Sequence, residues 1–264
     1  MALRLVSSAV IIPVLLLSLV AGGLWFAFPV AVLAGVAALE LARVSTGWDA
    51  RPLGPVAAAL ASGAAMYAYY VTPSSTPFNV LGVASTVTAL GSLGWLMMAA
   101  PDVNAVRRVG STLAVAGFVG GTMLHGTMLR GLNSGLDWLI FLLAVTFASD
   151  TFALAAGRAI GRRKLAPSIS PGKTWEGAIG GLVGAIVVAL ITNALVSIDI
   201  SIAAVIAFGV LLAVLGQAGD LIESKMKRNA GAKDSGSIVP GHGGTWDRLD
   251  SIVWNLVVVY HFVS

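Results

Sequence analysis

The sequence has no cysteine among its 264 residues. This absence excludes a disulfide framework, a thiolate nucleophile, an iron–sulfur cluster and a cysteine-ligated zinc site. Charged residues are also scarce, at 11%, whereas hydrophobic residues make up 57%. Soluble domains are about one quarter charged and about 45–50% apolar. The composition therefore predicts a membrane protein.

Other absences narrow the chemistry. The three histidines, at positions 125, 242 and 261, are far apart in the sequence, so a zinc site is not expected. No Gly-x-Ser-x-Gly setting for a nucleophilic serine occurs, which disfavours Ser/His/Asp hydrolysis. Residues 172–174 read Gly-Lys-Thr, but Pro167 stands where an ATP-binding P-loop requires its first glycine. We therefore expect neither a zinc enzyme nor a P-loop ATPase.

Long apolar stretches, separated by polar or Pro/Gly-rich breaks, dominate the sequence. A transmembrane helix needs about 20 mostly apolar residues, so we predict an all-α, polytopic membrane protein with about nine transmembrane helices. The predicted spans are residues 5–22, 24–42, 53–71, 79–99, 111–129, 136–156, 176–197, 202–219 and 251–264. The first span has features of a signal peptide, but no small-x-small cleavage site precedes a soluble region, so we expect a retained helix.

No segment outside these spans is long enough for an independent domain. We expect a single membrane domain over residues 1–264, with N-terminal helices at 1–130 and C-terminal catalytic helices and loops at 131–264. In the nine-helix arrangement, every lysine and arginine except Arg130 falls on the side that holds the N-terminus. Because basic loops favour the cytoplasm, we predict a cytoplasmic N-terminus, an external C-terminus and a polar active site that faces the cytoplasm.

A first charged loop follows Asp150, which itself lies within an apolar span. A carboxylate there is costly without a partner, so we expect it to have a functional role or to form a salt bridge. Between Asp150 and Glu176 the sequence has five basic residues, several glycines and no acid. Glycine allows close backbone approach, and Arg and Lys donate to phosphate, so this loop predicts a phosphate or lipid headgroup partner. Attraction to anionic lipids is the simpler alternative.

A second charged loop, residues 219–251, holds five acidic and five basic residues, which topology alone does not explain. Asp220, Glu223 and Lys227 share one helical face if the preceding helix continues through them. A turn-rich link would then allow Asp247 to approach Asp220. Paired carboxylates suit Mg²⁺, but salt bridges between helices are an equal alternative on composition alone.

From Ser224 to Asp250 the sequence has Ser, Lys-Arg, Lys-Asp, Pro-Gly-His-Gly-Gly, Asp-Arg and Asp in order. This segment resembles the signature of the phosphatidate cytidylyltransferases, also called CDP-diacylglycerol synthases. The upstream segment that begins at Ser170, Ser-Pro-Gly-Lys-Thr-Trp-Glu-Gly, is similar to a second motif of that family, although Gly172 occupies a place where lysine is common. The resemblance covers the C-terminal half by motif and the first 130 residues by hydrophobicity alone.

The resemblance implies transfer of the cytidylyl group from CTP to phosphatidic acid, which gives CDP-diacylglycerol and pyrophosphate in phospholipid biosynthesis. It implies Mg²⁺, with or without a second cation, held by the acids at Asp220 and Asp247. The implied partners are CTP, phosphatidic acid, membrane lipids and a second copy in a homodimer, with no nucleic acid. The implied location is the bacterial cytoplasmic membrane.

The expected site residues form two groups. Those expected in catalysis are Asp220, Lys227, Arg228, Lys233, Asp234, Asp247, Arg248 and Asp250. Those expected to contact substrate are Arg158, Ser170, Lys173, Thr174, Glu176, Ser224, His242, Gly243 and Gly244. The alternatives are a CTP-using enzyme acting on another membrane lipid phosphate or a polyprenol, and a non-enzymatic lipid transporter. The Asp-Gly-x-x-Ala-Arg pattern of CDP-alcohol phosphotransferases is absent.

Overall fold

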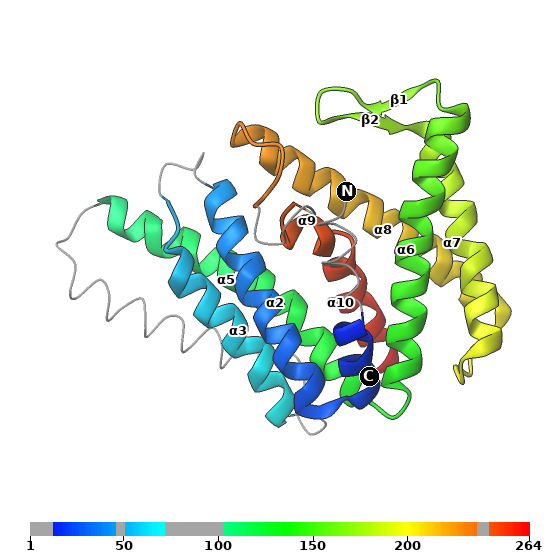
Figure 1. The fold of residues 1–264 in the computed structure, drawn as a ribbon, viewed down its shortest axis with the longest axis horizontal. Helices are drawn as coiled ribbons and strands as arrows, with labels where there is room; N and C mark the ends of the chain where they lie inside the picture. Colours follow the sequence, from blue (N-terminus) through cyan, green and yellow to red (C-terminus); the bar gives the residue numbers. More distant parts are fainter. Residues whose placement is uncertain (1–12, 46–50, 72–102, 237–242) are drawn as a thin grey trace. The chain divides into compact units, whose positions relative to one another are not determined.

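The computed structural model describes residues 13–45, 51–71, 103–236 and 243–264, and this part of the chain is mostly helical (Figure 1). It divides into two compact units. One contains Met1–Leu132 and Asn229–Leu249, and the other contains Asn133–Arg228 and Asp250–Ser264. The expected single membrane domain stays a prediction.

The first unit is built on three long helices, α2 (Gly23–Val44), α3 (Gly54–Val71) and α5 (Val103–Gly131), with the short helix α9 (Trp246–Leu249) against α2. Small residues allow the long helices to approach closely. A Cβ added to Gly120 of α5 would lie 3.0 Å from the Cα of Ala61 on α3, and the Ser62 hydroxyl donates to the Ala31 carbonyl of α2 at 2.8 Å. Packing of small residues is how helices associate in lipid, where the hydrophobic effect between helices is weak.

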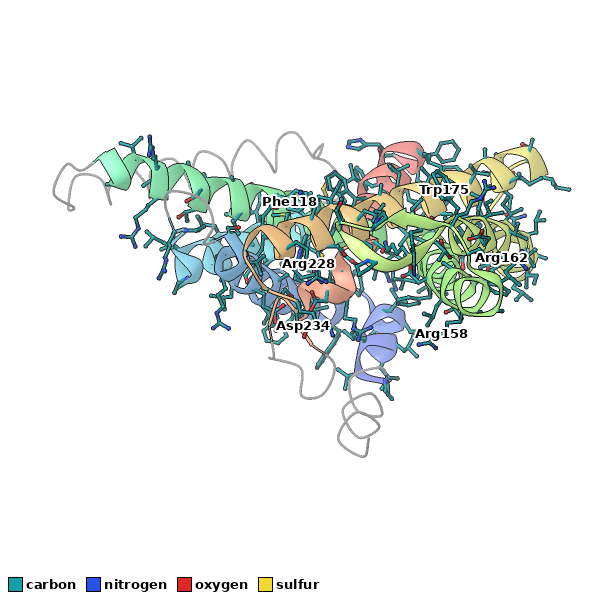
Figure 2. All side chains as sticks on the ribbon, turned by 90° about the horizontal axis from the view of Figure 1, so that it is seen from above. Phe118, Arg158, Arg162, Trp175, Arg228 and Asp234 are labelled. Carbon is teal, nitrogen blue, oxygen red and sulfur yellow. The ribbon has the colours of Figure 1, made fainter. Side chains whose placement is uncertain are left out.

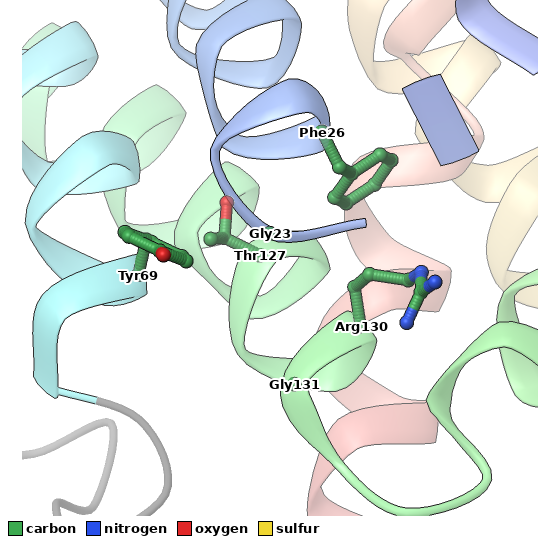
Figure 3. Close-up of a pocket in the computed structure, with 6 residues that line it drawn as sticks. All are labelled: Gly23, Phe26, Tyr69, Thr127, Arg130 and Gly131. Atoms are coloured by element: carbon green, nitrogen blue, oxygen red, sulfur yellow. The ribbon is translucent and has the colours of Figure 1, made fainter. Parts of the chain in front are cut away.

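A pocket of about 120 Å³ lies in the first unit where α2 begins and α5 ends (Figure 3). Its lining includes Phe26, Thr127 and Arg130. Arg130 donates from Nε to the Leu19 carbonyl at 2.8 Å and from Nη2 to the Val20 carbonyl at 3.0 Å, so it caps the helix that precedes α2. None of the expected site residues lines this pocket.

The second unit contains α6 (Gly135–Ile160), α7 (Trp175–Leu195), α8 (Ile202–Asn229) and α10 (Ile252–Val263). Between α6 and α7 lies an antiparallel hairpin of β1 (Lys164–Ala166) and β2 (Ser170–Thr174), visible at one end of these helices in Figure 1. Asn255 of α10 joins three helices, because its amide nitrogen donates to Thr146 Oγ1 of α6 at 2.8 Å and to the Leu212 carbonyl of α8 at 3.2 Å.

One face of α7 is an exposed apolar stripe. Ile179, Val183, Val187 and Ile191 recur every four residues and are 45–58% exposed. The opposite face buries small residues, including Gly181 and Ala185. Large apolar side chains outside and small ones inside are the arrangement expected of a helix that faces lipid. The stripe supports the conclusion that this is a membrane protein.

Among the described residues, five helices are long and apolar enough to cross a membrane: α2, α5 from Ala105, α6, α7 and α8. They confirm the predicted spans at 24–42, 111–129, 136–156, 176–197 and 202–219. Helix α3 covers the span predicted at 53–71, and the shorter α10 lies within 251–264. The span at 79–99 and the start of the span at 5–22 lie outside the described residues. The count of nine therefore stays a prediction.

The structure adds three features to the predicted spans. Helix α8 does not stop at residue 219 but continues to Asn229, and α5 begins at Val103 rather than 111. The segment after α6, expected as a loop, forms the β1–β2 hairpin. The added turns of α5 and α8 contain charged residues. Hydropathy detects only the apolar part of each helix and therefore does not include them.

Candidate active site

The hairpin is joined firmly to the start of α7. Thr174 caps α7, because its hydroxyl accepts from the Gly177 amide at 3.1 Å. The Glu176 carboxylate accepts from the amides of Arg162, at 3.0 Å, and Arg163, at 3.2 Å. Both side chains thus hold backbone in this structure, and their predicted contact with substrate stays a prediction.

Glycines around Thr174 have a packing role. A Cβ added to Gly161 would meet the Gly157 carbonyl and lie 2.8 Å from the Thr174 hydroxyl. A Cβ added to Gly177 would lie 2.8 Å from the Ala153 carbonyl. Gly161 and Gly177 are therefore needed for α6 and α7 to pack closely, whereas a Cβ at Gly172 would meet nothing within 4 Å.

Several basic side chains surround this end of the second unit. Figure 2 labels Arg158 and Arg162 near Trp175, where the hairpin connects α6 to α7. Arg158 and Arg162 are exposed. Arg228, at the end of α8, donates from Nε to the Ile169 carbonyl at 3.3 Å and so links α8 to the turn of the hairpin. These exposed guanidinium groups are available to an anionic ligand at the membrane surface.

A cluster of carboxylates lies at the centre of the second unit. Oxygens of Asp220, Glu223 and Asp250 all lie within 4.8 Å of one another. Gly219 allows this approach, because a Cβ there would lie 2.5 Å from the Asp250 carbonyl oxygen. The continuation of α8 confirms that Asp220, Glu223 and Lys227 lie on one helix, as the spacing predicted. Glu223 and Asp250 are buried.

Two lysines pair with the cluster. Lys173 Nζ of β2 lies 2.6 Å from Asp220 Oδ2, and Lys227 Nζ lies 2.7 Å from Glu223 Oε2. The Ser224 hydroxyl donates to Asp220 Oδ1 at 3.3 Å. Burial, together with the charges of Asp220 and Asp150, raises the pKa of Asp250 from 3.8 to about 7.

The donor set fits a hard divalent cation. Three carboxylates in one cluster supply the oxygen ligands that Mg²⁺ prefers. Burial is the largest cause of the raised pKa of Asp250, and the neighbouring charges of Asp220 and Asp150 raise it further. Salt bridges, the alternative from the sequence, are also present. The same side chains thus suit a cation site and form salt bridges.

Asp247, the other expected metal ligand, lies in the first unit. Its carboxylate accepts from the Gly244 amide at 2.9 Å and from the Ser235 amide at 3.1 Å. Gly243 has a φ of 82°, a conformation that favours glycine. Since Asp220 belongs to the second unit, a shared metal site of Asp220 and Asp247 stays a prediction.

The remaining expected residues are mostly at the surface. Lys233, Asp234 and Arg248 are exposed, and Ser170 begins β2. His242 lies outside the described residues. Sequence reasoning did not single out Glu40, a fully buried carboxylate of α2 that accepts from the Trp246 amide at 2.8 Å, next to Asp247. Its signal was present, because Glu40 is the one acid within the apolar span at 24–42.

Comparison with known proteins gives a match over nearly the full chain. A model of the cytidylyltransferase family matches residues 2–264. "Phosphatidate cytidylyltransferase 5, chloroplastic" of Arabidopsis thaliana is 48% identical over 138 residues, which are 50% of this chain and 34% of that protein.

Bacterial proteins named phosphatidate cytidylyltransferase are also similar. That of Staphylococcus saprophyticus is 43% identical over 124 residues, 47% of this chain and 48% of the relative. That of Brucella abortus is 42% identical over 151 residues, 55% of this chain and 54% of the relative. The chain thus spans between a third and just over half of the length of these curated relatives.

Proposed function

The chain belongs to the cytidylyltransferase family, and from this premise we propose that it transfers the cytidylyl group of CTP to phosphatidic acid. The products are CDP-diacylglycerol and pyrophosphate. The observation that carries the proposal is the cluster of Asp220, Glu223 and Asp250, with Lys173 and Lys227 bound to it, in a membrane protein. The bacterial relatives named phosphatidate cytidylyltransferase support the choice of lipid.

The reaction joins two anionic reactants. An oxygen of the lipid phosphate attacks the α-phosphorus of CTP, and the bond from that phosphorus to the bridging oxygen of the β-phosphate breaks, releasing pyrophosphate. No protein nucleophile is needed, so catalysis consists of positioning and charge stabilisation. A Mg²⁺ ion held by Asp220 and its neighbouring carboxylates would neutralise phosphate charge.

The lysines of the cluster suit a role in substrate binding. Lys173 pairs with Asp220, and Lys227 pairs with Glu223. We infer that both ammonium groups turn from carboxylate to phosphate when substrates bind. Arg228 is exposed beside the hairpin and adds a guanidinium donor.

The proposed location follows from the distribution of charge. The hairpin and the polar end of α8 carry many of the basic residues, so we propose that they face the cytoplasm of a bacterial cell, where CTP is present. The expected homodimer is part of the same proposal. Phosphatidic acid would reach the cluster from the membrane.

Purified protein in lipid nanodiscs, supplied with Mg²⁺ and CTP labelled at the α-phosphate, tests the function. Phosphatidic acid, other lipid phosphates and polyprenol are offered separately, with Asp220→Asn protein as the control. We expect labelled CDP-diacylglycerol and one pyrophosphate per product with phosphatidic acid. Labelled product only from another lipid phosphate, or labelled CDP released with polyprenol, would favour a related enzyme. Neither pyrophosphate nor CDP from any lipid would leave the transporter alternative.

A further inference from the structure

In the first unit, Glu40 contacts the residues around Asp247. We propose that Glu40 is a positioning residue, which holds the segment of residues 235–236 and 243–247, here called the anchored segment, and through it orients Asp247. The inference rests on the proposed function, because it assigns Asp247 to the transfer reaction. Glu40 itself contacts the anchored segment and is not assigned a contact with substrate.

Glu40 reaches the anchored segment from α2, about 200 residues earlier in the chain. Its side chain is 0% exposed. Oε2 accepts from the Trp246 amide at 2.8 Å and from the Ser235 hydroxyl at 3.4 Å. A buried carboxylate in an apolar helix is costly unless donors pair with it, and here two parts of one segment donate to Oε2.

Two glycines allow the anchored segment to close around this carboxylate. A Cβ added to Gly236 would meet Glu40 Oε1 and lie 2.7 Å from the carboxyl carbon. A Cβ added to Gly244 would meet the Ser235 hydroxyl and lie 2.8 Å from Glu40 Oε2. Gly244 was predicted to contact substrate. Its place against Glu40 gives a separate reason for glycine at this position.

The same residues connect Glu40 to Asp247. The hydroxyl of Ser235 donates to Glu40, while its amide donates to Asp247 at 3.1 Å. The Trp246 amide donates to Glu40, and Trp246 directly precedes Asp247. The Trp246 ring also packs edge-on against Phe118, with ring centroids 5.6 Å apart. Two parts of the backbone around Asp247, at Ser235 and at Trp246, are therefore held by their hydrogen bonds to Glu40.

Removal of the Glu40 carboxylate should release this arrangement. In Glu40→Ala, the Trp246 amide and the Ser235 hydroxyl lose their acceptor. A lost hydrogen bond to a charged group typically corresponds to about a ten- to hundredfold change in an equilibrium or rate. We expect kcat to fall by that factor and the Mg²⁺ concentration for half-maximal activity to rise.

A conservative pair separates geometry from charge. Glu40→Gln keeps the length of the side chain and an oxygen acceptor but loses the charge. Glu40→Asp keeps the charge but is one methylene too short to reach both donors. The proposal expects Glu40→Gln to retain most of the activity and Glu40→Asp to be as defective as Glu40→Ala. Ser45→Ala is the matched control, because Ser45 is buried at the end of α2 and bonds only to the Leu41 carbonyl in the described contacts.

Hydrogen–deuterium exchange of the full-length protein in detergent provides a readout independent of activity. Peptides that contain the amides of Ser235, Gly244 and Trp246 should exchange faster in Glu40→Ala and Glu40→Asp, and peptides from α6 and α7 should be unchanged. Unchanged exchange in both variants, or faster exchange with wild-type kcat and Mg²⁺ response, would overturn the proposal. If Glu40→Ala does not fold, the same measurements on Glu40→Gln and Glu40→Asp test the proposal.

The two proposals can fail separately. If the wild-type protein makes no cytidylyl product from any lipid while the exchange pattern is as expected, the proposed function is wrong and Glu40 still anchors the segment. If the wild-type protein is active and Glu40→Asp is fully active, the positioning role is wrong and the proposed function stands.

Discussion

Lys173, on the second strand of the hairpin, places its ammonium nitrogen 2.6 Å from a carboxylate oxygen of Asp220 on α8. The two side chains are 24% and 35% exposed, so the pair is open to solvent and to ligands. A lysine on one element is thus already bound to the acid proposed to hold a cation. The pair connects the two charged loops that the sequence analysis found separately.

Lys173→Ala should lower kcat/KM by about ten- to a hundredfold, because a charged donor to phosphate is lost. Folding should be little affected, since the ion pair is partly open to solvent, which screens its contribution to stability. The measurement is initial rate against CTP and lipid concentration. Lys164→Ala is the matched control, because Lys164 is an exposed lysine of the same hairpin. Equal rates in the two variants would remove Lys173 from the site.

Asp220→Asn and Asp247→Asn should each abolish cytidylyl transfer while the protein still inserts. Asparagine keeps the size of the side chain but removes the charge that would hold Mg²⁺. Initial rates per folded protein, measured against Mg²⁺ concentration, test the assignment. Asp199→Asn, at an exposed acid between α7 and α8, is the control. A wild-type Mg²⁺ curve in both site variants would leave these acids with salt bridges only.

Stability in the presence of a chelator should depend on Asp250. Its folded pKa is raised to about 7, so the folded state binds the proton more tightly than the unfolded state does. The contribution of the Asp250 carboxyl group to the stability of the folded state is complete below about pH 4, and it is lost as the pH rises through about 7. The Tm in detergent should therefore fall over this range in wild-type protein and less in Asp250→Asn.

Mg²⁺ should reverse that fall. A cation that binds the deprotonated cluster stabilises the folded state, and it competes with the proton, so its effect on Tm should be larger at pH 8 than at pH 5. The same Mg²⁺-induced shift at both values, or an unaltered profile in Asp250→Asn, would contradict a role for this carboxyl group.

Single cysteines test the orientation, since the natural sequence has none. Ser168 lies in the turn of the hairpin, and Asn133 lies in the turn between α5 and α6. An impermeant thiol reagent added to intact bacterial cells should label Asn133→Cys, and Ser168→Cys should react only after the cells are opened. The reverse pattern would invert the proposed topology.

Long apolar stretches in the sequence predicted several of the described helices. Apolar windows located α2, α5, α6, α7 and α8, because lipid requires long apolar helices with satisfied backbones. The spacing of Glu223 and Lys227 also predicted their common face, and the 2.7 Å ion pair confirms it. Helix ends were less predictable, since charged residues continue α8 beyond its apolar window.

Two parts of the site depend on contacts that no local pattern contains. The strand Ser170–Thr174 includes proline and glycine, which strands disfavour, and the backbone before it is held by Glu176. Glu40 finds its partners about 200 residues away, so its own surroundings in the sequence reveal only an acid in an apolar helix. Both the β1–β2 hairpin and the Glu40 contacts depend on residues that are distant in the sequence or outside the local pattern.

The lysine pairs of the second unit have a consequence for association kinetics. Because Lys173 and Lys227 are bound to carboxylates, their positive field is largely cancelled at the distances over which a free nucleotide diffuses. Capture of CTP by these lysines therefore gains little from long-range attraction. The exposed Arg158 and Arg162 provide the longer-ranged field, so neutralising them should flatten the ionic-strength dependence of the association rate.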